Sequence, residues 1–238
     1  MIARDRVIEE TNAAWLGVAK DGYAIVPQVV TAEEIEHLLS NLQRSSSHRS
    51  RAGLRHLLSN PAVAEFAADR RMLGIAQSVL GSDAFPFKAT LFDKSPDANW
   101  LITWHQDTAL PLCERIENPG WGPWSAKEGI AYAHAPATAL ESVVALRLHL
   151  DDSHQENGPP RVIPGSHRQG VLSDEQVENI VDKGERVTCL IEQAGVIVMH
   201  PLLVHASSKS QSDKPRRVLH IEYATRDAVA APLQLAIA

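Results

Sequence analysis

The chain has 238 residues, of which 44% are hydrophobic and 22% are charged, a composition typical of a folded globular protein. Its 23 Lys and Arg against 29 Asp and Glu give a formal net charge of −6, which argues against a nucleic-acid-binding protein. No apolar run approaches the roughly 18 residues of a membrane span, and the N-terminal residues lack the apolar segment of a secretory signal.

The first third of the chain, about residues 1–84, is expected to be mainly helical. A short strand, YAIVPQVV, follows Asp21-Gly22. Thr31 and Glu34 have the spacing of a capping box at the start of a helix with a clear apolar face. A further helical pattern starts at Asn60-Pro61, weakens near Asp69 and stops at Gly81.

From Phe85 the hydrophobic period becomes that of strands. The segments are short, rich in β-branched residues and separated by turn residues: PFKATLFDK, WLITWHQD, SVVALRLHLDD, RVTCLIEQ, GVIVMHP and RRVLHIEYA. Strands at such intervals without regular helices between them indicate an antiparallel sandwich or barrel over about residues 85–225. Residues 108–140 are rich in Pro, Gly and Trp, and we predict a lid within them over residues 108–126.

Three residues are candidates for a metal site. His105 and Asp107 lie two apart on a predicted strand and therefore face the same side. His205 follows a distant apolar strand and supplies the second imidazole of a 2-His-1-carboxylate triad, which binds Fe(II) on one face. His200 is the rival to His205, and His167, after a Pro-Gly turn, is interpreted as bracing a loop. A lone His-x-Asp arises often by chance, so the pattern needs support from other residues.

Arg216 is a candidate anchor for a carboxylate. It opens a predicted strand, where a guanidinium is held rigidly and offers two parallel donors. Ser207 lies two residues beyond His205 and adds a hydroxyl suited to the same carboxylate. The alternative is a solvated charge at a strand end, which the neighbouring Lys214 and Arg217 make a serious one.

The order of these features resembles a known family. His105-x-Asp107, then NGPPRVIPGSH at residues 157–167, then His205 and Arg216 resemble the phytanoyl-CoA dioxygenase family over about residues 15–225. These proteins are Fe(II)- and 2-oxoglutarate-dependent oxygenases. The resemblance implies a double-stranded β-helix (jelly-roll) with packed helices, and Fe(II), 2-oxoglutarate and dioxygen as cofactor and cosubstrates. It assigns the metal to His105, Asp107 and His205, and 2-oxoglutarate to Arg216, Ser207 and Lys88.

The resemblance leaves the substrate open. The chain is short for the family and has no basic cluster for a coenzyme A phosphate, and Ser210 stands where the family usually has Asn. Asp107 is present, whereas related halogenases lack this carboxylate, so hydroxylation of a small molecule is favoured; desaturation and cyclisation use the same chemistry. Trp121, Trp124 and Arg147 are candidate substrate contacts, with packing of a long loop as the alternative for the tryptophans.

Two other functions compete. One is a non-catalytic jelly-roll that binds a metal or a small molecule, which loss of a ligand or of Arg216 would indicate. The other is a cupin-like enzyme that does not use 2-oxoglutarate, against which the His-x-Asp pair argues. The two isolated cysteines, Cys113 and Cys189, indicate reduced thiols. We therefore expect a cytoplasmic enzyme formed by a single domain over residues 1–238, with a monomer as the starting assumption.

Overall fold

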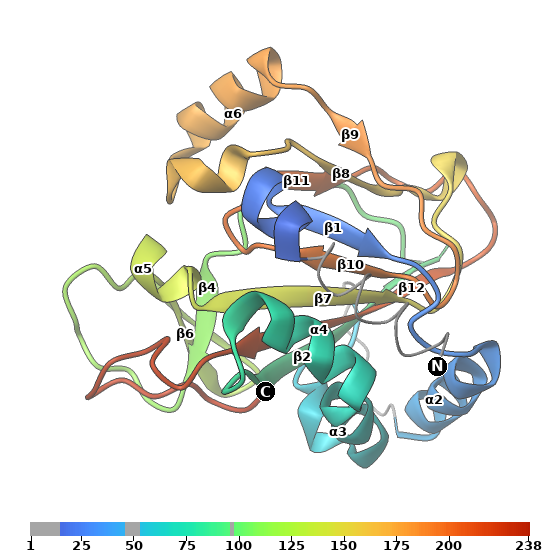
Figure 1. Cartoon of the computed structure of the whole chain (residues 1–238), viewed down its shortest axis with the longest axis horizontal. Coiled ribbons are helices and arrows are strands. Elements are labelled where there is room, and N and C mark those ends of the chain that lie inside the picture. Colours follow the sequence, from blue (N-terminus) through green and yellow to red (C-terminus); the bar gives the residue numbers. More distant parts are fainter. Residues whose placement is uncertain (1–14, 46–52, 96–97) are drawn as a thin grey trace.

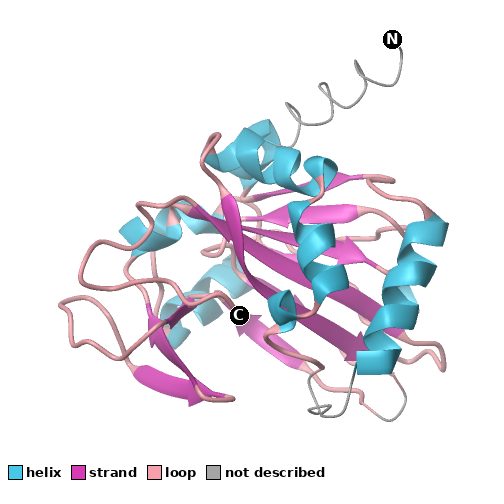
Figure 2. Ribbon diagram, turned by 90° about the horizontal axis from the view of Figure 1, so that it is seen from below, coloured by secondary structure: helices cyan, strands magenta, loops and turns pink. Residues whose placement is uncertain are grey.

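The computed structural model describes residues 15–45, 53–95 and 98–238. Within these ranges the strands form three antiparallel sheets (Figures 1 and 2). The large sheet contains, in order, β1 (Tyr23–Val26), β10 (Val196–Met199), β7 (Val143–His149), β12 (Arg216–Ala224) and β2 (Phe85–Lys94). The second contains β3 (Ile102–His105), β11 (His205–Ser207), β8 (Pro160–Val162) and β9 (Val187–Thr188). The third contains β4 (Ala109–Leu112), β6 (Ile130–His134) and β5 (Trp124–Lys127). The expected jelly-roll with packed helices is thereby confirmed.

Most helices precede β2 or connect strands. Residues 15–21 are helical, and the other helices are α2 (Ala32–Ser45), η1 (Leu57–Ser59), α3 (Pro61–Ala68), α4 (Arg70–Leu80), α5 (Ala137–Leu140), η2 (Gln155–Asn157), η3 (Ser166–Gln169) and α6 (Asp174–Lys183). None of the described helices is long and apolar enough to cross a bilayer.

Local sequence signals set the helix boundaries. Thr31 and Glu34 exchange the two hydrogen bonds of a capping box, at 2.7 and 3.2 Å. The Asn60 side chain accepts from the amides of Ala62 and Val63 at the start of α3. Asp69 separates α3 from α4, as the weakened pattern predicts.

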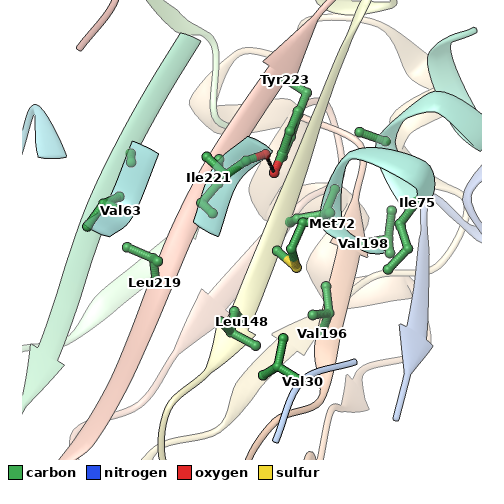
Figure 3. Packing of buried hydrophobic residues seen from close by; sticks show 14 of the residues in the cluster. Val30, Val63, Met72, Ile75, Leu148, Val196, Val198, Leu219, Ile221 and Tyr223 are labelled. Atoms are coloured by element: carbon green, nitrogen blue, oxygen red, sulfur yellow. Dashed lines mark hydrogen bonds between the residues drawn. The ribbon is translucent and has the colours of Figure 1, made fainter. Parts of the chain in front are cut away.

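Alternation along β12 divides its side chains between two environments. Leu219, Ile221 and Tyr223 pack against α3 and α4 in the main hydrophobic cluster (Figure 3). Each such buried side chain contributes roughly 1.5–3 kcal/mol relative to exposure. The hydroxyl of Tyr223 also donates to the Ala67 carbonyl at 2.9 Å. The intervening residues face the interior of the jelly-roll.

These inward-facing residues form two paired rows, here called the inner rows. Across β12 and β2 the pairs are Arg216 with Lys94, Val218 with Phe92, His220 with Thr90, and Glu222 with Lys88. At about 3.3 Å per residue, the first and last pairs lie about 20 Å apart along the strands. The two ends of the inner rows therefore lie in different parts of the jelly-roll interior.

The segment expected to be a lid is more regular than its composition indicates. Residues 108–140 contain β4, β5 and β6, which form the whole third sheet, and the short helix α5. This sheet begins directly after Asp107 and lies at one end of the large sheet (Figure 1). Proline and glycine are confined to its turns and to the edge strand β4. Their frequency in this segment indicates a loop, and for this reason the sequence does not predict the three strands.

Candidate active site

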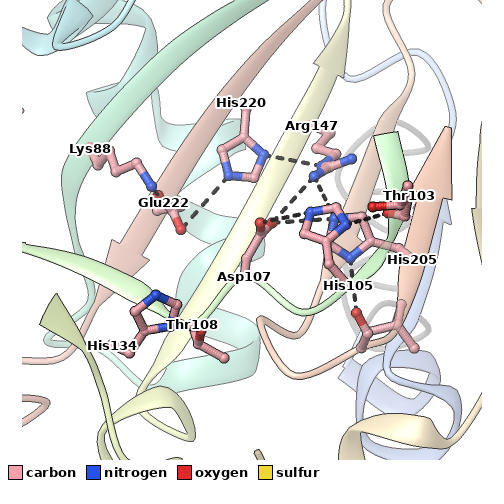
Figure 4. Close-up of polar contacts among 11 residues, drawn as sticks. Lys88, Thr103, His105, Asp107, Thr108, His134, Arg147, His205, His220 and Glu222 are labelled. Carbon is pink, nitrogen blue, oxygen red and sulfur yellow. Dashed lines mark hydrogen bonds and ion pairs between the residues drawn. The ribbon is translucent and has the colours of Figure 1, made fainter. Parts of the chain in front are cut away.

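Two imidazoles and one carboxylate converge where β3 meets β11. His105 and His205 are cross-strand partners, and their ring centroids are 4.3 Å apart. His105 Nε2 lies 3.5 Å from Asp107 Oδ1, and His205 Nε2 lies 3.4 Å from Asp107 Oδ2 (Figure 4). One ligand atom from each of the three residues lies within 4.8 Å of the others. The three predicted ligands are thus brought together.

The outer nitrogens of both rings are engaged by backbone. His105 Nδ1 lies 2.8 Å from the Thr103 carbonyl oxygen, and His205 Nδ1 lies 2.9 Å from that of Leu203. Each Nδ1–H therefore donates to a carbonyl, which leaves the lone pair on Nε2 directed at the carboxylate. This is the tautomer that a metal ligand requires.

The charge states also suit a divalent metal. Burial lowers the pKa of His205 to about 3, so its ring is neutral. Burial alone would raise the pKa of Asp107, but His205, His105 and Arg147 hold it well below the usual range. Burial alone would lower the pKa of His105, but its contact with Asp107 outweighs burial and raises that pKa. Neutral imidazoles and an ionised carboxylate are the forms that bind metal, so metal binding competes with protonation of His105. The residues present therefore fit the Fe(II) that the sequence implies.

Arg147 lies against the metal ligands. Its Nη2 is 3.3 Å from Asp107 Oδ2 and 3.1 Å from His205 Nε2, and its Nε donates to His220 Nδ1 at 3.1 Å. The contact with His205 Nε2 uses the lone pair that a metal ion would take, so the two exclude each other. The sequence predicts a substrate contact for Arg147. In the structure its guanidinium contacts Asp107, His205 and His220.

A cavity of about 230 Å³ runs from the metal ligands to Arg216. His105, Asp107 and Arg147 line one end, and Ser207 and Arg216 line the other. The walls between these ends are apolar: Phe92, Trp100, Ile102, Pro160 and Val218. The cavity is polar at both ends, the pattern that a small dicarboxylate requires.

Arg216 lines the end of the cavity away from the metal ligands, and Lys94 contacts the same Ser207 hydroxyl without lining the cavity. Arg216 is 5% exposed, and it donates to Ser207 Oγ at 3.2 Å and to the Asn157 carbonyl at 3.1 Å. Lys94 is 1% exposed, and its Nζ donates to the same Ser207 hydroxyl at 2.7 Å and to the Ser208 carbonyl. No carboxylate of the described ranges lies within salt-bridge distance of either cation. Burial of a cation without an anion is costly, so the end of the cavity at Arg216 favours the binding of an anion.

Sequence reasoning missed Lys94. Burial and the nearby Arg216 and Arg161 lower the pKa of Lys94 to about 7. The available signal was its place six residues after Lys88 on the same strand and thus on the same face. The sequence alone cannot show which of the two lysines lies opposite Arg216.

Lys88 lies at the other end of the inner rows. It pairs with Glu222, and it does not line the cavity that contains Arg216 and Ser207. The structure therefore does not bring Lys88 to the other two residues predicted to bind 2-oxoglutarate.

Trp121 and Trp124 do not line the cavity beside the metal ligands either. They pack with Leu112, Ala133 and Leu233. Trp124 is the cross-strand partner of Ala133 and shares its face of the third sheet, opposite to that of Tyr132. The structure thus favours the packing alternative for both tryptophans over the substrate contact predicted for them.

The NGPPRVIPGSH segment shapes the cation pocket rather than supplying ligands. The Asn157 carbonyl accepts from Arg216, and the Gly158 carbonyl accepts from Ser207 Oγ at 2.8 Å. Gly158 has a φ of +71°, and a Cβ there would lie 2.3 Å from the Ser208 carbonyl oxygen, so only glycine fits.

The rival histidines form a pair of their own. The rings of His167 and His200 lie 5.2 Å apart. His200 Nδ1 accepts the amide of Leu202 at 3.1 Å. Neither belongs to the group formed by His105, Asp107 and His205. His200 opens a turn, in which its carbonyl accepts from the Leu203 amide at 3.0 Å.

Comparisons with known proteins give one family. The family model for phytanoyl-CoA dioxygenase (PhyH) matches residues 18–218. L-proline trans-4-hydroxylase of Streptomyces griseoviridis is 27% identical over 180 residues, which is 64% of this chain and 59% of the relative. Ectoine dioxygenase of Stutzerimonas stutzeri is 23% identical over 168 residues, with 64% and 49% covered. The chain thus spans between half and three fifths of these two relatives.

Solved structures share the fold at lower identity. The epimerase SnoN, in complex with Fe3+, alpha ketoglutarate and nogalamycin RO, has a TM-score of 0.70 at 19% identity, covering 92% of this chain and 85% of that one. EctD from S. alaskensis, with 2-oxoglutarate and 5-hydroxyectoine, has a TM-score of 0.68 at 17% identity, covering 90% and 75%.

Proposed function

Because the chain belongs to the phytanoyl-CoA dioxygenase family, we propose that it is an Fe(II)- and 2-oxoglutarate-dependent dioxygenase. The reaction is the hydroxylation of an unactivated C–H bond of a small organic molecule, with release of succinate and carbon dioxide. One observation carries the proposal: two members of a 2-His-1-carboxylate group, His105 and Asp107, line one end of a small cavity, and Arg216 with Ser207 lines the other. The acidic chain and its two free cysteines support a cytoplasmic location.

His105, Asp107 and His205 would hold the metal on one face. When bound, Fe(II) supplies the activation of dioxygen, which is coupled to oxidative decarboxylation of 2-oxoglutarate. The chain's own contribution is to keep Asp107 ionised and, through the carbonyls of Thr103 and Leu203, to make Nε2 the metal-binding nitrogen of both rings. Because the hydrogen bond from Arg147 competes for His205 Nε2, that contact must open when the metal binds.

Arg216, Lys94 and Ser207 would bind the distal carboxylate of 2-oxoglutarate. A carboxylate at this point replaces the repulsion between two buried cations with charge-assisted hydrogen bonds. The apolar walls at Phe92 and Val218 suit the methylene groups between the two carboxylates. The cavity therefore orients the cosubstrate with its keto acid toward His105 and Asp107.

The competing functions explain fewer of these features. A non-catalytic binding protein has no need for a complete ligand set beside a separate anion pocket. A cupin-like enzyme that does not use 2-oxoglutarate has no role for Lys94 and Arg216, whose burial is costly.

Anaerobic reconstitution tests the proposal. Protein loaded with Fe(II) and 2-oxoglutarate should develop a metal-to-ligand charge-transfer absorbance. Admission of oxygen should then yield succinate, and chelation of the metal with EDTA should abolish both signals. Binding of Fe(II) without any charge-transfer band or succinate would favour one of the two competing functions.

A further inference from the structure

A second polar cluster lies beyond the metal ligands, away from Arg216. Lys88 and Glu222 form a buried ion pair at the far end of the inner rows, where Glu222 is 1% exposed. His220 Nε2 lies 3.8 Å from Glu222 Oε1, and His220 Nδ1 accepts from Arg147, which contacts Asp107 (Figure 4). The cluster is thus linked to the metal ligands through two side chains.

The third sheet supplies the other side of this cluster. On β6, Tyr132 is 1% exposed, and its hydroxyl lies 3.0 Å from His56 Nε2. Lys127 Nζ lies 4.4 Å from the centroid of the Tyr132 ring, and Lys88 Nζ lies 5.8 Å from the same centroid. Two ammonium groups are therefore placed around one tyrosine ring.

Lys127 is held in place by a tight hairpin. It pairs with Ile130 across a two-residue turn in which Glu128 and Gly129 have φ values of 51° and 85°. Two positive φ values in a two-residue loop are the mark of a type I′ turn, which matches the twist of the strands. The turn consequently fixes the backbone of Lys127 on the face of the sheet that carries Tyr132.

Lys127 differs from its neighbours in having no anion. Lys88 pairs with Glu222, and Arg55 lies 3.6 Å from Glu128. Among the residues that the structure describes, no carboxylate lies within 4.0 Å of Lys127 Nζ. Partial burial, Lys88 and Arg55 lower the pKa of Lys127, and the charges of Glu222 and Asp107 oppose this shift.

The two faces of the third sheet carry different side chains. Tyr132 and Lys127 share one face of the third sheet, whereas Trp124 packs on its other face. The face with Lys127 and Tyr132 therefore presents an ammonium and a phenol hydroxyl, next to Ile130 and Pro111.

We propose that Lys127 binds the carboxylate of a small polar substrate at the end of the inner rows where the Lys88–Glu222 pair lies. This assignment rests on the proposed oxygenase function and narrows its substrate class to small organic acids, amino acids included. Thioesters of coenzyme A fall outside this class.

Matched pairs of acids and amides test the assignment. The Fe(II)- and 2-oxoglutarate-loaded enzyme is incubated with the common amino acids and short carboxylic acids, each paired with its primary amide. At least one acid should raise succinate formation above the rate without substrate, and its amide should not. Lys127→Gln should raise the KM of that acid about tenfold, the effect of losing about 1.4 kcal/mol of binding. Lys127→Arg should restore most of the lost affinity for the acid. Lys183→Gln, which changes an exposed lysine, should have the KM of the wild type.

Three results would overturn the assignment: stimulation by amides as strong as by acids, an unchanged KM in Lys127→Gln, or no stimulating acid at all. The affinity for 2-oxoglutarate, measured from the charge-transfer absorbance, separates this failure from that of the proposed function. A wild-type protein that does not bind 2-oxoglutarate contradicts the oxygenase itself. One that binds it normally but shows no preference for acids contradicts only the role of Lys127.

Discussion

Lys94 and Arg216 lie directly opposite each other on β2 and β12, and both donate to the hydroxyl of Ser207. Both are almost fully buried. Two cations that share one neutral acceptor in the interior are destabilising until an anion joins them. This relationship makes the cosubstrate pocket sensitive to single substitutions in ways that can be measured.

Replacement of Arg216 should weaken 2-oxoglutarate binding selectively. Truncating one partner of a buried charge pair costs roughly 2–5 kcal/mol, so Arg216→Gln should raise the Kd of 2-oxoglutarate roughly 30-fold or more. Arg217→Gln is the control, because Arg217 faces the other way and pairs with Asp151 at 2.7 Å. Titration of each Fe(II)-loaded variant with 2-oxoglutarate, followed by the charge-transfer absorbance, measures the two Kd values. Loss of binding in the Arg217 variant alone would show that the anchor is misassigned.

The affinity for 2-oxoglutarate should fall with rising pH through Lys94. Burial and the neighbouring Arg216 and Arg161 lower the pKa of Lys94 to about 7. Below pH 7 the Lys94 ammonium is charged and favours binding of the carboxylate. Above pH 7 Lys94 is mostly neutral, so it must take up a proton when 2-oxoglutarate binds. The Kd should therefore increase by up to about tenfold per pH unit above 7, until the raised pKa of the bound state is passed. Lys94→Met should bind weakly at every pH and show no such slope between pH 7 and 9; a slope retained in this variant would assign it to another group.

Metal affinity should depend on His205 and not on His200. Loss of a group that merely orients a ligand costs 10- to 100-fold in metal affinity, so loss of a ligand in His205→Asn should cost roughly 100-fold or more. His200→Asn is the matched control, because His200 Nδ1 accepts a backbone amide outside the triad. Anaerobic calorimetric titration with Mn(II) compares the two variants. Near-normal binding in His205→Asn together with weak binding in His200→Asn would reverse the ligand assignment.

Lys88→Met should affect stability far more than cosubstrate binding. It leaves Glu222 buried without its cation, which should lower the free energy of unfolding by about 3 kcal/mol. Removal of both charges in Lys88→Met/Glu222→Leu should restore part of that loss. Urea denaturation measures the stability of all three proteins. The family resemblance predicts a role for Lys88 in 2-oxoglutarate binding, and a tenfold rise in the Kd of the single variant would support that role over the one inferred from its position.

The sequence predicts features that depend on short-range periodicity. His105 and Asp107 share a face because alternation holds over two residues of any strand, and the caps at Thr31 and Asn60 depend on contacts within four residues. The choice of Lys94 over Lys88 could not be predicted in this way. Both lysines share a face, and only the pairing of β2 with β12 places Lys94 opposite Arg216.

Composition was a poor guide to the third sheet. Proline, glycine and tryptophan in residues 108–126 indicate a loop, yet the tight turn at Glu128-Gly129 builds a hairpin from the residues around it. Once β5 is known, alternation places Trp124 and Lys127 on opposite faces. The tryptophans belong to a hydrophobic cluster for this reason, and the polar face carries Lys127.

The alternation along β12 determines where the chain tolerates changes in length. Deletion of one residue between Arg216 and Glu222 would turn the remaining inward side chains outward, because Leu219, Ile221 and Tyr223 are fixed to α3 and α4 on the outer face. Cosubstrate anchor and metal surroundings would then be lost together, although no ligand had been replaced. Added or lost residues at 211–214, in the connection before β12, leave that alternation intact. Homologues should therefore differ in length before Arg216 and keep a constant spacing from Arg216 to Tyr223.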